Sequence, residues 1–217
     1  MKIIKQSAKL IGIMVPANIN TFNEIIFDGF PETLIEQAGR VCYKSEDKIT
    51  LDSSTEFINK ICKNKHASVL EHSCASIRII TDRGISHEIV RHRLASYSQE
   101  STRYVNYTKE KHGKGDIQFI LPEGLTPEQL DLFMDKYAAD QTFYNKAIEL
   151  GCTPQQARDG LPTGLKTELV MTCNFREWQH FIALRTAQTA HPKMRTLAKL
   201  VNGILIKVAP TVFKIEI

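Results

Sequence analysis

The chain has 217 residues, of which 42 % are hydrophobic and 24 % charged, and these ordinary globular proportions exclude collagen-like, mucin-like and wholly disordered proteins. The formal net charge is +4, from 28 Lys and Arg against 24 Asp and Glu, an excess too weak for a dedicated nucleic-acid-binding module. Because no apolar run approaches the roughly 18 residues of a membrane span and the amino terminus lacks a signal-peptide core, we expect a soluble, cytoplasmic protein without membrane partners.

The amino-terminal half is predicted to hold two strands and three helices. Pro16 ends the first apolar run, and Pro31 fits the first turn of the first helix. Ser53 and Glu56 have the spacing of a capping box, which predicts the start of the second helix, while Gly84 separates the second strand from the third helix. The predicted strands cover residues 8–15 and 74–81, and the predicted helices cover residues 31–43, 53–63 and 85–94.

The carboxyl-terminal half carries stronger helix signals. Thr126 followed by Pro127, and Thr153 with Gln156 three residues later, are typical helix starts, and Gly151 marks a helix end. The predicted helices cover residues 126–150, a short stretch from 153, 174–187 and 192–209, and the predicted strands cover residues 116–121, 165–173 and 211–217. Helices outnumber strands and do not alternate with them regularly, so we predict an α+β fold rather than a doubly wound parallel sheet. No linker or repeat interrupts the sequence, which predicts a single domain over residues 1–217.

The spacing of cysteines and histidines argues against a disulfide framework and against a metal site. The five cysteines are odd in number and form no C-x-x-C pair, which favours free thiols in a reducing compartment. His87 and His92 are five residues apart, about 140° around a helix, and therefore do not match the i, i+4 histidines of a zinc metalloprotease. We expect no metal, and a metallohydrolase built on the histidines is an alternative that metal analysis tests.

The densest group of candidate ligand-binding side chains lies at residues 91–104. Arg91, His92 and Arg93 are followed by Ser101 and Arg103, so guanidinium and hydroxyl donors suited to phosphate are concentrated there. A basic helix end exposed to solvent has the same charges, because cations interact favourably with a helix carboxyl terminus. A nucleic-acid-binding segment is a further alternative, and the weak net charge argues against it.

Two further groups of polar residues flank this segment. The upstream group is His66, Ser68, Glu71 and His72, and the downstream group is Arg158, Asn174, Arg176, Leu184 and Arg185. Asn174 and Arg176 stand at a predicted strand-to-helix junction, where backbone and side-chain donors can converge on a ligand. Arg176 and Arg185 are nine residues apart, about 180° out of alignment on one helix, so we expect them to serve different ligands or different subunits. The sequence contains no P-loop, G-x-G-x-x-G or G-x-S-x-G motif.

Taken together, these groups resemble the flavin-dependent thymidylate synthases (the ThyX family). The family signature of Arg-His-Arg, seven residues and Ser is matched by Arg91-His92-Arg93 and Ser101. The resemblance extends to the HxSxxEH pattern of the upstream group and to the downstream Asn-x-Arg and Leu-Arg pairs, in the family's order. It implies a mainly antiparallel sheet flanked by helices and a homotetramer. One subunit of this length has little surface with which to enclose a flavin, a nucleotide and a folate, so we expect binding sites that are shared between subunits.

The resemblance implies the reductive methylation of dUMP to dTMP. Methylenetetrahydrofolate would supply the carbon, FAD reduced by NADPH would supply the hydride, and tetrahydrofolate would be released. A second class of thymidylate synthases attacks dUMP with a cysteine in a Pro-Cys-His context. No cysteine here is preceded by Pro or followed by His, which agrees with a reaction that uses no enzyme thiol as nucleophile.

The resemblance also implies site residues, position by position. The positions that match FAD contacts are His66, Ser68, Glu71, Arg91, His92, Arg93, Asn174 and Arg176, and those that match dUMP contacts are Glu88, Gln99, Ser101, Arg103, Arg158 and Arg185. Arg185 would polarise the uracil carbonyl as charge develops there, and His66 would lie near the flavin, where the folate stacks. Glu88, Ser98 and Gln99 depart from the usual family pattern, and we expect Glu88 to meet a sugar hydroxyl rather than the phosphate.

Overall fold

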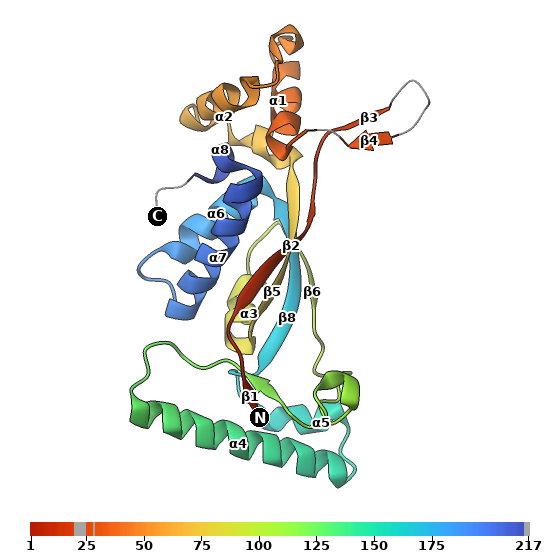
Figure 1. Cartoon of the computed structure of the whole chain (residues 1–217), viewed down its shortest axis with the longest axis vertical. Coiled ribbons are helices and arrows are strands. Elements are labelled where there is room, and N and C mark those ends of the chain that lie inside the picture. Colours follow the sequence, from red (N-terminus) through yellow and green to blue (C-terminus); the bar gives the residue numbers. More distant parts are fainter. Residues whose placement is uncertain (20–24, 28, 215–217) are drawn as a thin grey trace. The chain divides into compact units, whose positions relative to one another are not determined.

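The computed structural model describes residues 1–19, 25–27 and 29–214, which form two compact units (Figure 1). The first unit consists of Met1–Ser7, Ile79–Arg91 and Tyr97–Val170, and the second of Ala8–Arg78, His92–Ser96 and Met171–Ile217. Each unit is therefore assembled from segments that are separate in sequence. This interleaving explains why no linker is visible in the sequence, and the single domain stays a prediction.

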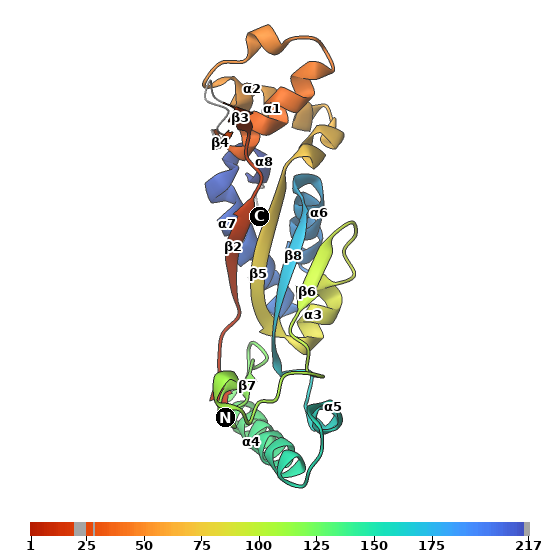
Figure 2. The same ribbon diagram turned by 90° about the vertical axis from the view of Figure 1, so that its right-hand side faces the viewer.

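The described residues contain a four-stranded antiparallel sheet, which confirms the expected α+β architecture (Figure 2). Its strand order is β2 (Ser7–Ile13), β5 (Cys74–Asp82), β8 (Lys166–Asn174) and β6 (Ser96–Gln99). Buried and partly exposed residues alternate regularly along β8, as expected of a strand whose faces have different environments. Two strand pairs accompany the sheet, a parallel one of β1 (Lys2–Ile3) with β7 (Gln118–Phe119) and an antiparallel one of β3 (Ala17–Ile19) with β4 (Ile25–Phe27).

The first unit is organised around one long helix and a cluster of aromatic side chains. Its helices are α3 (Arg83–Ile89), η3 (Glu110–His112), α4 (Pro127–Glu149), α5 (Pro154–Ala157) and η4 (Arg158–Gly160). Thr126 and Thr153 both precede a helix and form capping boxes with Gln129 and Gln156, so the predicted starts of α4 and α5 are confirmed. Phe119 stacks on Tyr137 of α4 with ring centroids 4.5 Å apart, and both rings are buried. This cluster anchors α4 to the short strand β7.

The second unit contains the longer run of helices. They are α1 (Pro31–Val41), η1 (Glu46–Lys48), α2 (Ser53–Lys63), η2 (Ala67–His72), α6 (Phe175–Thr186), α7 (Pro192–Val208) and α8 (Pro210–Phe213). Helices α6 and α7 lie side by side (Figure 1). Trp178 of α6 is fully buried and donates its indole N–H to the carbonyl oxygen of Ala75 in β5 at 3.1 Å. Helix α6 is thereby fixed on the sheet, which matters because it carries several of the predicted site residues.

Three local predictions are wrong in detail. Helix α2 does begin at Ser53, but Asp52 is the residue before it, and the Ser53 hydroxyl donates instead to the carboxylate of Glu36 at 2.8 Å. The helix expected over residues 85–94 ends at Ile89. The strand expected over residues 211–217 is contradicted by α8, and residues 215–217 lie outside the described part of the chain.

The turn into α8 has a distant cause. The buried carboxylate of Glu32 in α1 accepts hydrogen bonds from the backbone N–H groups of Thr211 and Val212, at 2.6 and 3.1 Å. A carboxylate at this place satisfies N–H groups that lack partners within the first turn of a helix. The apolar residues near Thr211 suggested a strand, and this contact from α1 favours the helical turn instead.

None of the helices in the described residues combines the length and the apolar character needed to cross a membrane.

Candidate functional site

The first unit contains a cavity of about 390 Å³ that is rich in hydrogen-bond donors. Its wall includes Arg83, His87, Thr102 and Arg158, which we call the Arg158 cluster. Arg158 follows α5 and donates from Nη1 to the hydroxyl oxygen of Thr102 at 3.3 Å. Asp159, whose side chain is largely exposed, is the acidic neighbour of Arg158, with its carboxylate oxygen 4.0 Å from Nε. A loose, solvent-exposed pair of this kind neutralises little charge.

The second arginine of the cluster bonds to neutral oxygen atoms. Arg83 donates from Nη1 to the carbonyl oxygen of Glu100 at 3.1 Å and to the hydroxyl oxygen of Thr167 at 3.3 Å. The amide of Gln99 donates to the same Thr167 hydroxyl at 3.1 Å and to Ser86 at 2.9 Å. Because these acceptors carry no formal charge, they orient the guanidinium while leaving its positive charge available for an anionic ligand.

Most of the other predicted nucleotide-binding residues of this unit lie outside the Arg158 cluster. Arg158 lines the cavity, whereas Glu88, Gln99, Ser101 and Arg103 are not among the side chains of its wall. Gln99 lines a second cavity of about 590 Å³ in the same unit. Ser101 accepts a hydrogen bond from the backbone N–H of Arg103 at 3.3 Å, and the exposed Arg103 guanidinium lies 5.3 Å from the ring centroid of Tyr104. The structure therefore brings together part of the predicted set.

Sequence reasoning missed three members of the Arg158 cluster, Arg83, His87 and Thr102. The first two were recognisable in principle, because they are four residues apart and share one face of α3. Asp82 marks the start of that helix, since its side chain accepts a hydrogen bond from the N–H of Ile85 at 2.8 Å. Thr102 is buried and carried no comparable signal.

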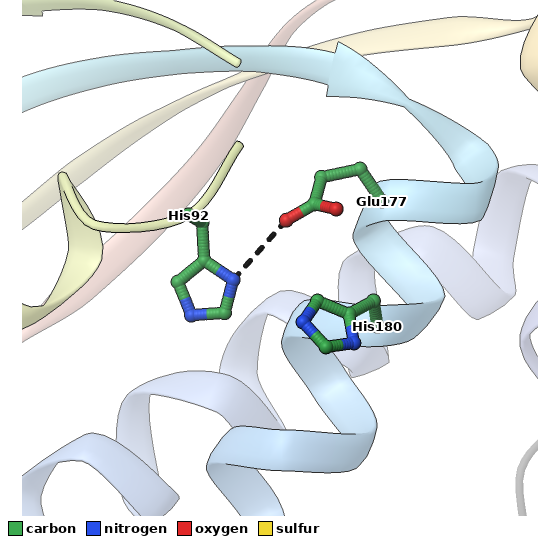
Figure 3. A group of neighbouring side chains, drawn as sticks. All are labelled: His92, Glu177 and His180. Carbon is green, nitrogen blue, oxygen red and sulfur yellow. Dashed lines mark hydrogen bonds and ion pairs between the residues drawn. The ribbon is translucent and has the colours of Figure 1, made fainter. Parts of the chain in front are cut away.

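The second unit holds a chain of three side chains, Arg185, His92 and Glu177, which we call the Arg185 chain. Arg185 donates from Nε to Nε2 of His92 at 2.9 Å. On the other side of the ring, Nδ1 of His92 lies 3.2 Å from a carboxylate oxygen of Glu177 (Figure 3). His92 is 4 % exposed, and its ring contacts Phe181 edge-on with centroids 4.9 Å apart. Glu177, Phe181 and Arg185 are each four residues apart in α6, so they lie along one side of that helix.

Burial and neighbouring charge set the ionisation of this chain. Burial, followed by the nearby Arg185 and His180, lowers the pKa of His92 to about 4, so the imidazole is neutral near pH 7. Burial raises the pKa of Glu177, and the neighbouring His180 partly opposes that shift. The imidazole therefore accepts from the Arg185 guanidinium as a neutral ring.

A second arginine of α6 has a separate partner. Arg176 donates from Nη1 to a carboxylate oxygen of Glu71 in η2 at 2.5 Å, and both side chains are about half exposed. Asn174 caps α6, because its side-chain oxygen accepts a hydrogen bond from the N–H of Glu177 at 2.9 Å. Arg176 and Arg185 thus have different partners, in line with their offset around the helix. Which ligands they serve stays a prediction.

The remaining residues predicted to bind flavin are mostly exposed. His66 lines a cavity of about 810 Å³ that α1 and α2 also line, and Ser68 is exposed in η2. The flavin-matching positions of the second unit are His66, Ser68, Glu71, His92, Arg93, Asn174 and Arg176, whereas Arg91 ends a segment of the first unit. His92 is the exception among them, since it is buried and both ring nitrogens already have partners.

One group within the described residues has the composition of a metal site. The ligand atoms of His92, Glu177 and His180 lie within 4.8 Å of one another (Figure 3). A cation bound at Nδ1 of His92 would lie on a ring whose other nitrogen already contacts the Arg185 guanidinium, and the positive charges would repel each other. The absence of a metal stays a prediction.

Three of the thiols lie in environments that raise their pKa. Cys173 is buried, and burial raises its pKa far above that of an ordinary thiol. Burial also raises the pKa of Cys62 and of Cys74. A nucleophilic cysteine needs a lowered pKa, so these environments favour chemistry that does not use a thiolate.

Comparison with known proteins gives concordant results along most of the chain. The family model described as "Thymidylate synthase complementing protein" matches residues 26–211. The chain is 34 % identical over 194 residues to the flavin-dependent thymidylate synthase of Geobacter sulfurreducens, covering 85 % of this chain and 81 % of that protein. It is 36 % identical over 201 residues to the enzyme of the same name from Mycobacterium tuberculosis, covering 86 % and 79 %.

A solved structure has the same fold at low sequence identity. The UMP/dUMP methylase PolB from Streptomyces cacaoi, bound with 5-Br dUMP, superposes with a TM-score of 0.79 at 19 % identity. The match covers 99 % of this chain and 96 % of that chain. The antiparallel sheet with its flanking helices is therefore an arrangement already known in solved structures.

Proposed function

The chain belongs to the thymidylate synthase complementing protein family, and from this premise we propose that it is a flavin-dependent thymidylate synthase acting on dUMP. The reaction converts dUMP, methylenetetrahydrofolate, NADPH and a proton to dTMP, tetrahydrofolate and NADP⁺. The uracil C5–H bond is replaced by a C5–CH₃ bond, and the two electrons come from NADPH. The observation that carries this proposal is the match to flavin-dependent thymidylate synthases over more than four-fifths of the chain.

The Arg158 cluster supports the part of the proposal that concerns dUMP. A nucleotide phosphate carries up to two negative charges, and the guanidinium groups of Arg83 and Arg158 are oriented mainly by neutral oxygens. We place the phosphate at the cavity that these residues line. The other assigned nucleotide positions are Glu88, Gln99, Ser101 and Arg103, with Glu88 at a sugar hydroxyl, because a carboxylate accepts from a hydroxyl and repels a phosphate.

The exposed donors of the second unit are chemically suited to FAD. Arg176 and Arg93 supply guanidinium groups for a diphosphate, and Ser68 supplies a hydroxyl group. The hydrogen bond to Glu71 already restricts the Arg176 side chain, so that side chain loses less conformational entropy when FAD binds. When bound and reduced by NADPH, FAD supplies the hydride of the reaction.

Arg185 is the residue that we assign to stabilising charge during the reaction. Its guanidinium stays protonated at working pH and can donate to a uracil carbonyl oxygen as negative charge develops there. His66 is assigned to the place where the pterin of the folate stacks, and its exposure on the wall of a large cavity is compatible with such a contact. Neither role requires a thiol.

We also propose that the active protein is a homotetramer. One chain of this length would have to surround a flavin, a nucleotide and a folate, and residues from neighbouring copies would complete walls that a single copy lacks. A monomeric protein with full activity would contradict this part of the proposal.

A product assay with single omissions tests the proposed function. The purified protein, incubated with dUMP, methylenetetrahydrofolate, NADPH and FAD, is expected to form dTMP, and the omission of any one component should abolish turnover after bound FAD has been removed. The protein as purified is expected to show flavin absorbance. A colourless protein that binds no added FAD, or dTMP formation that is independent of FAD, would contradict the proposal.

A further inference from the structure

The hydrogen bonds of His92 determine which of its ring nitrogens carries the proton. The Nε of Arg185 carries a hydrogen and can only donate, so Nε2 of His92, at 2.9 Å, must accept. A ring that accepts at Nε2 carries its proton at Nδ1. That proton points to the carboxylate oxygen of Glu177 at 3.2 Å (Figure 3), which can only accept while it is ionised. The direction of donation therefore runs from Arg185 to His92 and from His92 to Glu177.

The surroundings of His92 hold this neutral tautomer. The ring is buried, packs edge-on against Phe181, and lies with its centroid 5.7 Å from that of His180. Protonation of Nε2 would set a cationic ring against the Arg185 guanidinium in a site with little water. Burial, Arg185 and His180 lower the pKa of His92. The Glu177 carboxylate beside Nδ1 acts in the opposite direction, because an anion favours the charged ring, and burial with Arg185 and His180 outweighs it near pH 7.

Arg185 and Glu177 favour the same neutral tautomer from opposite sides of the ring. With an acceptor at Glu177, the Nδ1–H form satisfies both ring nitrogens, whereas the Nε2–H form would bring two donors together at Arg185 and leave Nδ1 without a proton to donate. Glu177 and Arg185 are eight residues apart on α6, and the ring of His92 bridges the two turns between them. Glu177 can thus act on the Arg185 guanidinium without touching it.

We propose that Glu177 is a positioning residue for Arg185, which it orients by holding His92 in the Nδ1–H tautomer. The inference rests on the proposed function, in which Arg185 donates to the uracil carbonyl. The hydrogen bond from Nε to His92 fixes the plane of the guanidinium, and a displacement of about 1 Å in a group that stabilises the transition state lowers the rate by ~10²-fold.

The tautomer is tested first, on the FAD-bound protein without substrate. ¹⁵N chemical shifts of the histidine rings, assigned by comparison with His92→Asn, are expected to show a proton on Nδ1 and a lone pair on Nε2 of His92 near pH 7. In Glu177→Leu, where only Arg185 still favours this tautomer, the preference is expected to be weaker. A doubly protonated ring, an Nε2–H ring, or a metal ion bound at Nδ1 would overturn the proposal whether or not the protein makes dTMP.

Steady-state kinetics then test the consequence for Arg185. Glu177→Leu is expected to lower kcat by about 10-fold to 100-fold, with the KM for dUMP changed less than about 3-fold and the FAD content unchanged. Glu177→Gln keeps an oxygen that accepts from Nδ1, so most of the kcat lost in Glu177→Leu should be recovered. If the negative charge of Glu177 were needed only for structure, Glu177→Gln would not recover this activity. Glu46→Gln, which removes an exposed carboxylate of the same unit, serves as the control.

The outcomes separate this inference from the proposed function. An active wild type together with a fully active Glu177→Leu variant would overturn the positioning role and leave the synthase assignment intact. A wild type that binds FAD but forms no dTMP would contradict the synthase assignment, and the histidine spectra would still decide whether the Arg185 chain exists. If Glu177→Leu does not fold, the spectra of the wild type and the activity of Glu177→Gln decide the question.

Discussion

The two arginine-containing clusters differ in what their arginines bond to. In the Arg158 cluster, guanidinium groups donate to hydroxyl and carbonyl oxygens of Thr102, Thr167 and Glu100. In the Arg185 chain, the guanidinium donates to a neutral imidazole that is itself held by a carboxylate. The first arrangement leaves charge available to attract an anion, and the second restricts the orientation of one guanidinium. We infer that the first serves binding and the second serves the chemical step.

The largest loss of activity is expected when the Arg185 guanidinium is removed. Arg185→Ala is expected to lower kcat/KM for dUMP by about 10²-fold to 10³-fold, because the loss of one donor to a developing charge has effects of that size. Arg185→Lys should recover little, since an ammonium group cannot make the directed Nε contact with His92. FAD content should be unchanged. Near-normal turnover in Arg185→Ala would remove the proposed role, and Lys207→Ala, an exposed cation of α7, is the control.

A change in the Arg158 cluster should affect binding instead. Arg158→Ala is expected to raise the KM for dUMP by about 10-fold to 100-fold, as the loss of a charged hydrogen bond predicts, with kcat altered less than about 3-fold. Steady-state kinetics measure both values. Lys146→Ala removes an exposed cation of α4 and should leave both values unchanged. If Arg158→Ala lowered kcat and left KM unchanged, the distinction between the clusters would fail.

The pH dependence of stability should reveal the buried His92. Its pKa is about 4 in the folded state and about 6.5 when exposed, so the unfolded chain binds the proton first as the pH falls. The neutral ring of His92 makes its full contribution to the free energy of unfolding above about pH 6.5. This contribution, at most about 3 kcal/mol, is lost as the pH falls towards about 4. Glu177, with its raised pKa, changes stability in the opposite direction.

Urea unfolding of the wild type and of His92→Asn, at several pH values from about 7 to 4.5, measures this contribution. The wild type should lose more stability than the variant over that range. Equal pH slopes for the two proteins would mean that His92 titrates normally in the folded state.

The smallest effect is expected at the pair of Glu71 and Arg176. Both side chains are about half exposed, so Glu71→Gln should change the free energy of unfolding by less than about 1 kcal/mol. Because Glu71 orients Arg176, we expect FAD to bind several-fold more weakly, as measured by titration of flavin fluorescence. A large loss of stability would show that the pair is structural rather than part of a binding surface.

Local sequence signals predicted the elements whose causes are local. Thr126 and Thr153 cap helices with partners three residues away, and both starts are confirmed. The end of α3 was not predictable in this way, because the chain leaves the first unit after Arg91 and the partners of His92 lie 85 and 93 residues away. The helical turn α8 similarly depends on Glu32, 179 residues from Thr211.

The same distinction applies to the candidate site. The resemblance named His92 and Arg185 separately, as a flavin contact and a nucleotide contact, and the structure joins them through one hydrogen bond. It gave no indication of Glu177, whose place is visible only once α6 and the segment at His92 are brought together. Arg83 was also missed, since its partners Glu100 and Thr167 are distant in sequence.

Equilibrium binding of FAD and dUMP to two arginine variants decides whether the two units bind different ligands. The dissociation constants of FAD and of dUMP would be measured for Arg158→Ala and for Arg176→Ala. We expect Arg158→Ala to weaken dUMP binding and to retain FAD affinity. Arg176→Ala should weaken FAD binding and should retain dUMP affinity when the protein is saturated with flavin. Equal losses of both ligands in both variants would contradict the assignment of Arg158 to dUMP and of Arg176 to FAD.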